Sequence, residues 1–192
     1  ADAKSELQGE VDKLQKDLES TKEFYFDVEL DGENHHRSNV LGFSFLVNNN
    51  CKLKKKGIFL NSDISKYLED SNILKYTLDS KKTWLTLKYL GINVSGIVYD
   101  FLVGAYLINP SYLSGDLKTI FEHFKNVNLE YHEEVYGKKT KYQIPDVEVF
   151  GKYGMHKVEA LKETLSDVLK LLEEFEIKDL YYQVELPLAV VL

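Results

Sequence analysis

Three acidic side chains alternate along one short segment of this sequence. Asp27, Glu29 and Asp31 are each separated by one apolar residue. This period of two predicts a β-strand, on which all three carboxylates lie on one face. Carboxylate oxygens are the ligands that Mg²⁺ and Mn²⁺ take in two-metal nucleases. The pattern therefore fits one part of a metal-dependent nuclease site, although an ordinary strand with a solvated acidic face has the same appearance.

The strands and helices around this segment predict a mixed α/β domain. An apolar second strand at residues 40–47 and a short third strand at 57–60 follow the first, which indicates antiparallel pairing at the start of the sheet. After residue 61, helical and strand patterns alternate, as they do in α/β folds. The predicted elements are helix 63–70, strand 73–76, helix 81–90, strand 97–99, helix 100–108 and helix 117–124. Asp79 is the expected N-cap of helix 81–90, whose inner side is expected to carry Trp84, Leu85, Leu87 and Leu90.

The two ends of the chain and one long polar stretch complete the expected organisation. Residues 5–20 have the apolar spacing of an amphipathic helix, and residues 125–145 are predicted to form a long surface loop. Helices are expected from 147 to 176 and again from 178. The final run, residues 186–192, is apolar and has no helix stop signal, so we expect the sequence to be a fragment of a longer protein.

Composition argues against several classes of protein. The chain has 192 residues and a formal net charge of −7, with 24 basic residues against 31 acidic ones. Its single cysteine, Cys51, cannot form an internal disulfide framework or a thiolate zinc cluster, and no apolar run is long enough to span a membrane. We therefore expect a cytoplasmic protein. Because nucleic-acid affinity depends largely on Lys and Arg, and the basic run at residues 52–56 is predicted to be a solvated turn, tight DNA binding by the isolated chain is not expected.

Five segments in collinear order, from about residue 23 to the last residue, carry a family resemblance. They are residues 24–31, 39–45, 90–110, 133–139 and 182–192. Together they resemble bacterial DNA polymerase I (family A). The first is similar to the Asp-x-Glu motif of proofreading exonuclease domains, the fourth to a loop of Bacillus-type enzymes, and the last to the exit into the polymerase domain. The resemblance implies a ribonuclease H-like 3′–5′ exonuclease fold, a mixed sheet of about five strands flanked by helices.

The resemblance also implies which further carboxylates an active proofreading site needs. The aspartate of the second motif falls at Thr83. The aspartate of the third motif, Tyr-x-x-x-Asp, falls near His156, where Tyr153 is followed four residues later by Lys157. Threonine cannot replace a carboxylate ligand, and lysine opposes Mg²⁺ binding. As in the Bacillus-type enzymes, whose exonuclease domain is vestigial, we expect no catalytic residue, no metal and no cofactor in this domain.

The leading hypothesis is therefore a vestigial exonuclease domain within an enzyme that extends DNA primers in replication and repair. Asp27 and Glu29 match the first motif and are the reason to test this hypothesis. One alternative is an active metal-dependent 3′–5′ exonuclease that uses Asp27, Glu29 and Asp79. A second alternative is a module whose acidic surface docks a protein partner.

The resemblance also implies a domain organisation and a set of partners. Residues 1–22 are expected to form an N-terminal helix or linker, residues 23–176 the exonuclease-like domain, and residues 177–192 the start of a helix leading into a polymerase domain. The expected partners are that polymerase domain, which would use Mg²⁺, and DNA through the full-length protein. A monomer without membrane contact is expected.

Overall fold

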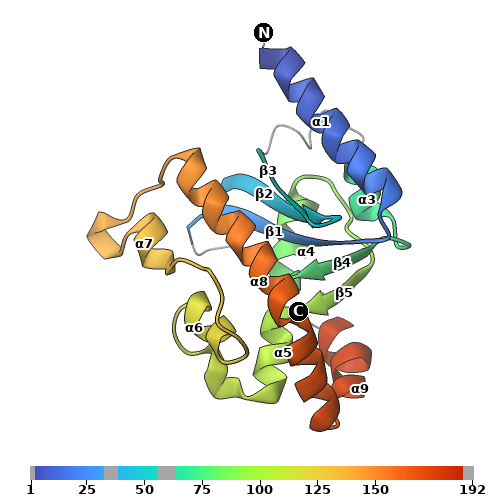
Figure 1. Cartoon of the computed structure of the whole chain (residues 1–192), viewed down its shortest axis with the longest axis vertical. Coiled ribbons are helices and arrows are strands. Elements are labelled where there is room, and N and C mark those ends of the chain that lie inside the picture. The colour runs from blue at the N-terminus through green and yellow to red at the C-terminus, as the bar shows by residue number, and fades with distance from the viewer. Residues whose placement is uncertain (1–2, 33–38, 56–63, 188–192) are drawn as a thin grey trace.

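The structure is built on one mixed sheet, as the sequence predicts. The computed structural model of the protein describes residues 3–32, 39–55 and 64–187. Its strands are β1 (Glu23–Asp31), β2 (Asn39–Val47), β3 (Asn50–Lys55), β4 (Leu74–Thr77) and β5 (Ile97–Asp100). They form a 5-stranded sheet in the order β3-β2-β1-β4-β5 (Figure 1). Because β1 pairs antiparallel with β2 and parallel with β4, the N-terminal hairpins and the later α/β units share one sheet.

Helices cover both faces of this sheet. One apolar core joins the sheet to α1 (Ala3–Ser20), α3 (Ile64–Glu69) and α4 (Ser80–Tyr89). The other joins it to α5 (Phe101–Ile108), α6 (Leu117–Glu122), α7 (His132–Tyr136) and α8 (Val147–Glu174). Figure 1 shows α8 crossing in front of the sheet and α4 behind it. Phe24, Phe26 and Val28 of β1 pack in the first core. The alternate side chains, Asp27 and Glu29, therefore face α8.

The hairpin between β2 and β3 is tighter than the sequence predicts. Asn48 and Asn49 adopt φ values of 50° and 65°, the left-handed conformation of a two-residue hairpin turn. The chain turns back at once, so that Leu46 lies opposite Cys51 in the register. Residues 52–55 of the basic run thus lie in a strand, and the expectation of a solvated turn there is wrong. The predicted strand at 57–60 lies outside the described residues.

The inner face of α4 is more polar than predicted. Thr83 and Thr86 are buried beside Leu87, whereas Trp84 is only half-buried. The placement of Trp84 on the inner side of this helix is therefore wrong. Small hydroxyl side chains fill the space between α4 and the sheet, and the indole ring lies toward the outer surface.

The predicted loop at 125–145 also contains regular structure. It holds α7 and a 3₁₀ turn at Lys139–Lys141, and both Val135 and Tyr136 are buried. The side chain of Glu134 accepts a hydrogen bond from the backbone N–H of Tyr131 at 3.1 Å, which caps the first turn of α7. An unbroken polar loop is thus the wrong description, because two apolar side chains anchor the segment to the core.

The C-terminal segment is tied to the start of α5 by one tyrosine. The hydroxyl of Tyr181 accepts a hydrogen bond from the backbone N–H of Asp100 at 2.7 Å and donates one to its carbonyl oxygen at 3.0 Å. Tyr181 is fully buried, and the side chain of Leu186 is only 6% exposed. The domain boundary after residue 176 stays a prediction.

Asp100 joins this segment to the start of α4. Its carboxylate accepts hydrogen bonds from the backbone and the hydroxyl of Ser80, at 2.7 and 2.6 Å, and from the backbone N–H of Val103 at 2.9 Å. Burial raises the pKa of Asp100 to about 6, while these hydrogen bonds oppose the rise. The residue therefore links β5, α4 and α5 at the same end of the sheet as the acidic strand residues.

We expect Tyr181→Phe to destabilise the domain by about 1–3 kcal/mol, because two buried backbone groups lose a partner. The measurement is the free energy of unfolding in urea. Tyr182→Phe is the matched control, since Tyr182 is 38% exposed, and it should change stability by less than about 0.5 kcal/mol. Equal effects of the two substitutions would show that the Tyr181 hydroxyl does not hold the segment in place.

Candidate functional site

Two acidic residues of β1 are buried in this fold. Asp27 and Glu29 are 1% and 3% exposed and point to the same side of the sheet. Asp31, the third acidic residue of the pattern, lies at the end of the strand and is only partly buried, where the hydroxyl of Tyr142 reaches it at 3.4 Å. The strand therefore brings together two of the three predicted carboxylates, and it places them where uncompensated charge is unfavourable.

A lysine of α8 compensates both carboxylates. The Nζ atom of Lys157 lies 2.7 Å from Oδ2 of Asp27 and also forms an ion pair with Oε1 of Glu29. Lys157 is 5% exposed, and the ring of Tyr153, one turn earlier on α8, lies 4.8 Å from its ammonium group. A second lysine, Lys82 of α4, places its Nζ 2.9 Å from Oδ1 of Asp27. Two cations thus converge on the pair of acids.

A tyrosine of α7 completes the arrangement. The Tyr136 hydroxyl donates a hydrogen bond to Oε2 of Glu29 at 2.6 Å. Burial, together with the nearby charge of Glu29, raises the pKa of Tyr136 far above its ordinary value, so the phenol stays protonated and remains a donor. Sequence patterns alone do not mark Tyr136 as a residue of the site. The available signal was the pair Val135–Tyr136, two large side chains inside an otherwise polar stretch.

All four oxygens of the two carboxylates are consequently engaged. Oδ1 of Asp27 pairs with Lys82, Oδ2 with Lys157, Oε1 of Glu29 with Lys157, and Oε2 with Tyr136. Burial opposes ionisation of Asp27, but Lys157 and Lys82 outweigh it and hold the pKa of Asp27 below its ordinary value. Burial likewise opposes the charge on Lys157, and the two carboxylates hold its pKa well above the usual range. Asp27 and Lys157 therefore both stay charged at neutral pH.

A glycine allows Lys157 to reach the strand. Gly154 lies one turn before it on α8, where a Cβ atom would overlap the hydroxyl of Ser44 on β2 and lie 3.4 Å from Cγ of Glu29. Any larger side chain would therefore push α8 away from the sheet. The close approach of helix and sheet at Gly154 sets the depth at which the lysine ammonium enters the site.

The positions that the family resemblance assigned to further metal ligands hold no free carboxylate. Thr83 is buried, and its hydroxyl has no hydrogen-bond partner among the described residues. His156 is turned to Glu130, whose carboxylate lies 2.8 Å from its Nδ1 atom. Asp79 caps α4, as predicted, by accepting a hydrogen bond from the backbone N–H of Lys82 at 3.0 Å. The carboxylate of Asp79 thus serves the helix terminus.

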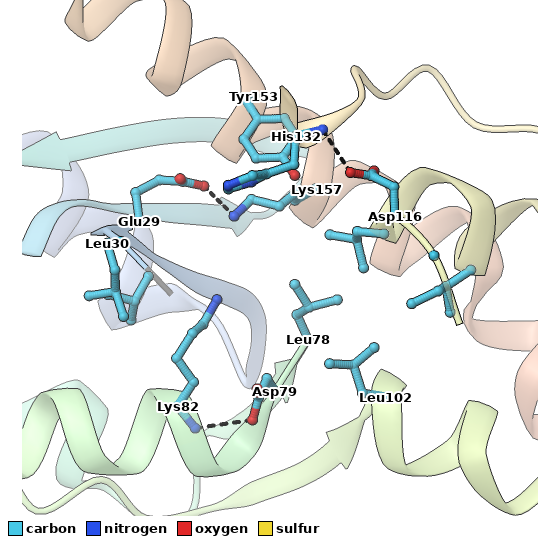
Figure 2. Close-up of a pocket in the computed structure, with 15 residues that line it drawn as sticks. Glu29, Leu30, Leu78, Asp79, Lys82, Leu102, Asp116, His132, Tyr153 and Lys157 are labelled. Carbon is cyan, nitrogen blue, oxygen red and sulfur yellow. Dashed lines mark hydrogen bonds and ion pairs between the residues drawn. The ribbon is translucent and has the colours of Figure 1, made fainter. Parts of the chain in front are cut away.

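A cavity of about 370 Å³ lies beside these residues, at the carboxyl ends of β1 and β4. Figure 2 shows Glu29, Lys157 and Tyr153 on one wall and Lys82 with Asp79 on another. Its remaining walls are largely apolar, formed by Leu30, Leu78, Leu102, Leu117 and Ile120. Asp116 also lines the cavity, but its carboxylate accepts hydrogen bonds from the backbone of Lys118 and of His132, as an N-cap of α6.

The donor set of the cavity does not fit a divalent metal ion. Within the parts of the chain that the structure describes, no three His, Cys, Asp or Glu side chains gather closely enough to hold one. Mg²⁺ requires several oxygen ligands in a regular octahedron. Here the two central carboxylates enclose a lysine ammonium, and the charge of that group would repel a cation at the same place.

Comparison with known proteins decides the family. Residues 26–164 match the family described as DNA polymerase I, ribonuclease H-like domain. The chain belongs to this family. It is 29% identical to DNA polymerase I of Bacillus subtilis over 168 aligned residues. The alignment covers 87% of this chain and 19% of that protein. The chain is 31% identical over 183 residues to DNA polymerase I of Streptococcus pneumoniae, covering 95% and 20%. The chain spans about a fifth of the length of these curated relatives.

A solved structure confirms the ribonuclease H-like fold. Ribonuclease D of Escherichia coli superposes with a TM-score of 0.70 over 94% of this chain and 47% of its own. The two sequences are only 13% identical, so the likeness concerns the fold alone. Among the described residues, no helix of this member of the DNA polymerase I family is both long and apolar enough to cross a membrane.

We expect Lys157→Met to destabilise the domain by about 3–5 kcal/mol at pH 7, because it leaves two buried carboxylates without their shared cation. In the unmodified protein, the lowered pKa of Asp27 means that its ion pairs stabilise the fold above pH about 4 and are lost as the pH falls through the lowered pKa. In the variant the carboxylates favour their protonated form. The loss of stability should therefore be largest at neutral pH and smaller near pH 4.

The measurement is the free energy of unfolding of both proteins between pH 4 and 8. Lys170→Met is the control, because the Lys170 side chain is 76% exposed, and it should cost less than about 0.5 kcal/mol. A difference between Lys157→Met and the unmodified protein that does not change with pH would contradict the assignment of a buried, charged pair.

Proposed function

We propose that this chain is a non-catalytic 3′–5′ exonuclease-like domain of a DNA polymerase I, and that it supports a polymerase domain in the longer protein. One observation carries the proposal. The Nζ atom of Lys157 lies between Asp27 and Glu29, and every oxygen of these carboxylates already takes part in an ion pair or a hydrogen bond. Two-metal cleavage of a phosphodiester needs such carboxylates to hold the ions that activate water and stabilise the leaving oxygen.

The energetics of the site favour the lysine over a metal ion. A free ion loses translational freedom on binding and must shed tightly held water, whereas Lys157 is already attached to α8. Its displacement would break two ion pairs and leave an ammonium group inside an apolar part of the protein. Metal binding at the first-motif carboxylates is therefore opposed both by charge and by the loss of these pairs.

An active exonuclease that uses Asp79 with Asp27 and Glu29 is the weaker candidate. Asp79 accepts the backbone hydrogen bond that caps α4. The side chain of Lys82, in the first turn of the same helix, pairs with Asp27. The matches to DNA polymerase I of Bacillus subtilis and Streptococcus pneumoniae support the wider role, in which a polymerase domain extends DNA and this domain supports it.

The direct test uses a labelled single-stranded DNA oligonucleotide with Mg²⁺ or Mn²⁺. We expect the purified protein to leave the 3′ end of the oligonucleotide intact, because no metal is held to activate water. The Asp27→Ala variant should give the same low level of degradation. The measurement is product length on a denaturing gel. Degradation that disappears in Asp27→Ala would establish the active exonuclease instead. Degradation that persists in Asp27→Ala would indicate a contaminating nuclease.

A second test restores the two missing acids. We expect the double variant Thr83→Asp/Lys157→Asp to be unstable in EDTA, because four buried carboxylates repel one another, and to be stabilised by Mn²⁺. Binding at about a hundred times the dissociation constant adds about 2.7 kcal/mol, or roughly 5–10 °C in Tm for a domain of this size. Thermal unfolding with and without Mn²⁺ measures the shift. The same changes combined with Asp27→Asn and Glu29→Gln should abolish it.

A further inference from the structure

The contact between Lys157 and Asp27 places an amino group directly against a carboxyl group in the interior. The Nζ atom of Lys157 lies 2.7 Å from Oδ2 of Asp27, and both residues are at most 5% exposed. The Cγ carbon of Asp27 is one C–O bond beyond that oxygen, so it lies at most about 4 Å from Nζ. A nucleophile and an acyl carbon held this close react as if at a very high concentration, because their encounter costs no further entropy.

Glu29 is placed to accept a proton from the same amino group. Its Oε1 atom forms an ion pair with Nζ of Lys157, so a proton can pass between them over one contact (Figure 2). Its Oε2 atom accepts the hydrogen bond from Tyr136, which fixes the orientation of the carboxylate. A carboxylate held within hydrogen-bond reach of a nucleophile is what general base catalysis requires.

Lys82 approaches Asp27 from the other side. Its Nζ lies 2.9 Å from Oδ1, the oxygen that Lys157 does not pair with. Attack on Cγ would develop negative charge on Oδ1, and the ammonium group of Lys82 would stabilise that charge as an oxyanion-hole donor does. The second oxygen of Glu29 has only the neutral hydroxyl of Tyr136. Of the two carboxyl groups that Lys157 contacts, Asp27 is therefore the better acceptor.

The surroundings of this contact keep water away from it. The ring of Tyr153 lies 4.8 Å from the Lys157 ammonium group, and α8 passes close to β2 at Gly154. Burial removes water as a competing nucleophile, and it also lowers the cost of converting an ion pair into a neutral amine and acid. The charged pair remains the resting form, and the transfer of a proton within it gives the neutral pair that can react.

We propose that Lys157 and Asp27 condense slowly to an intramolecular amide bond, with Glu29 as the proton carrier and Lys82 as the group that stabilises the tetrahedral intermediate. The ammonium group gives up two protons, one directly to Oδ2 of Asp27 and one through Glu29. A bond forms between Nζ and Cγ, the bond between Cγ and Oδ2 breaks, and Oδ2 leaves with both protons as one water molecule. No oxidant, metal ion or cofactor is consumed. The product joins β1 covalently to α8.

Mass spectrometry of the denatured protein tests the proposal directly. After several weeks at neutral pH, the unmodified protein should contain a species that is lighter than its sequence by the mass of one water. Proteolytic digestion should then release a branched peptide in which the segments around Asp27 and Lys157 are joined. Peptide mapping is needed, because a succinimide at Asp31–Gly32 would cause the same change of mass without joining two segments.

Three variants assign the roles. Glu29→Gln keeps the size of the side chain but removes the proton carrier, and it should slow the reaction about a hundredfold or more. Glu163→Gln, at an exposed position of α8, makes the same change of charge and should leave the rate unchanged. Lys157→Arg keeps a cation beside the buried carboxylates but supplies no free amine, so it should show no loss of mass. Circular dichroism verifies that each variant is folded.

The proposal is overturned if the stored unmodified protein keeps its full mass, an outcome that does not depend on the folding of any variant. It is also overturned if the loss of water maps elsewhere, including a bond between Lys157 and Glu29, or if Glu29→Gln reacts as fast as Glu163→Gln. None of these outcomes bears on the absence of exonuclease activity, which the Mn²⁺ assay decides separately, because the ion pair and the amide both withhold Asp27 from a metal ion.

Discussion

The structure depends on the neutralisation of two carboxylates that β1 carries into the interior. Buried charges are tolerated when they are paired and hydrogen-bonded, and the cation must arrive with the right depth and direction. Lys157 meets this requirement because Gly154 lets α8 pass close to β2. The position of the longest helix in the domain is therefore coupled to the charges of the central strand.

The same requirement shapes the segment before α8. Tyr136 is drawn into the core by its hydrogen bond to Glu29, and α7 forms around it within a stretch of polar residues. Four separate elements, β1, α4, α7 and α8, thus meet at one buried group of charges. In a metal-dependent relative of this fold such carboxylates would hold exchangeable ions. Here the counter-charge is covalently part of the chain.

Local patterns in the sequence predict the secondary elements well, and contacts between distant segments less well. The alternation around Asp27, the capping role of Asp79 and the helices at either end follow from spacing and residue type. Tyr136 and Glu29 are 107 positions apart, and no periodicity of neighbouring residues relates them. The strand at 50–55 was missed because two asparagines in left-handed conformation turn the chain sooner than the polar run indicates.

Among the residues of the site, Lys157 is the one that its position in the sequence marks most clearly. Lys157 occupies a position in the buried stripe of α8, among residues such as Tyr153, Val158 and Leu161. A charge on an apolar stripe requires a buried partner, and Asp27 and Glu29 of β1 provide it. The family resemblance added the register, since it placed this lysine after the tyrosine of the third motif. The geometry of the ion pairs themselves depended on the close approach at Gly154, which spacing alone does not show.

The internal ion pair also has an evolutionary consequence. Replacing Lys157 by a neutral residue strands two carboxylates in the core, and replacing it by aspartate adds a third, with Lys82 as the nearest remaining cation. Each of these single substitutions would therefore give a less stable protein. Selection for a stable fold alone would be enough to retain the lysine. The loss of folding stability that follows each substitution would keep Lys157 in the core.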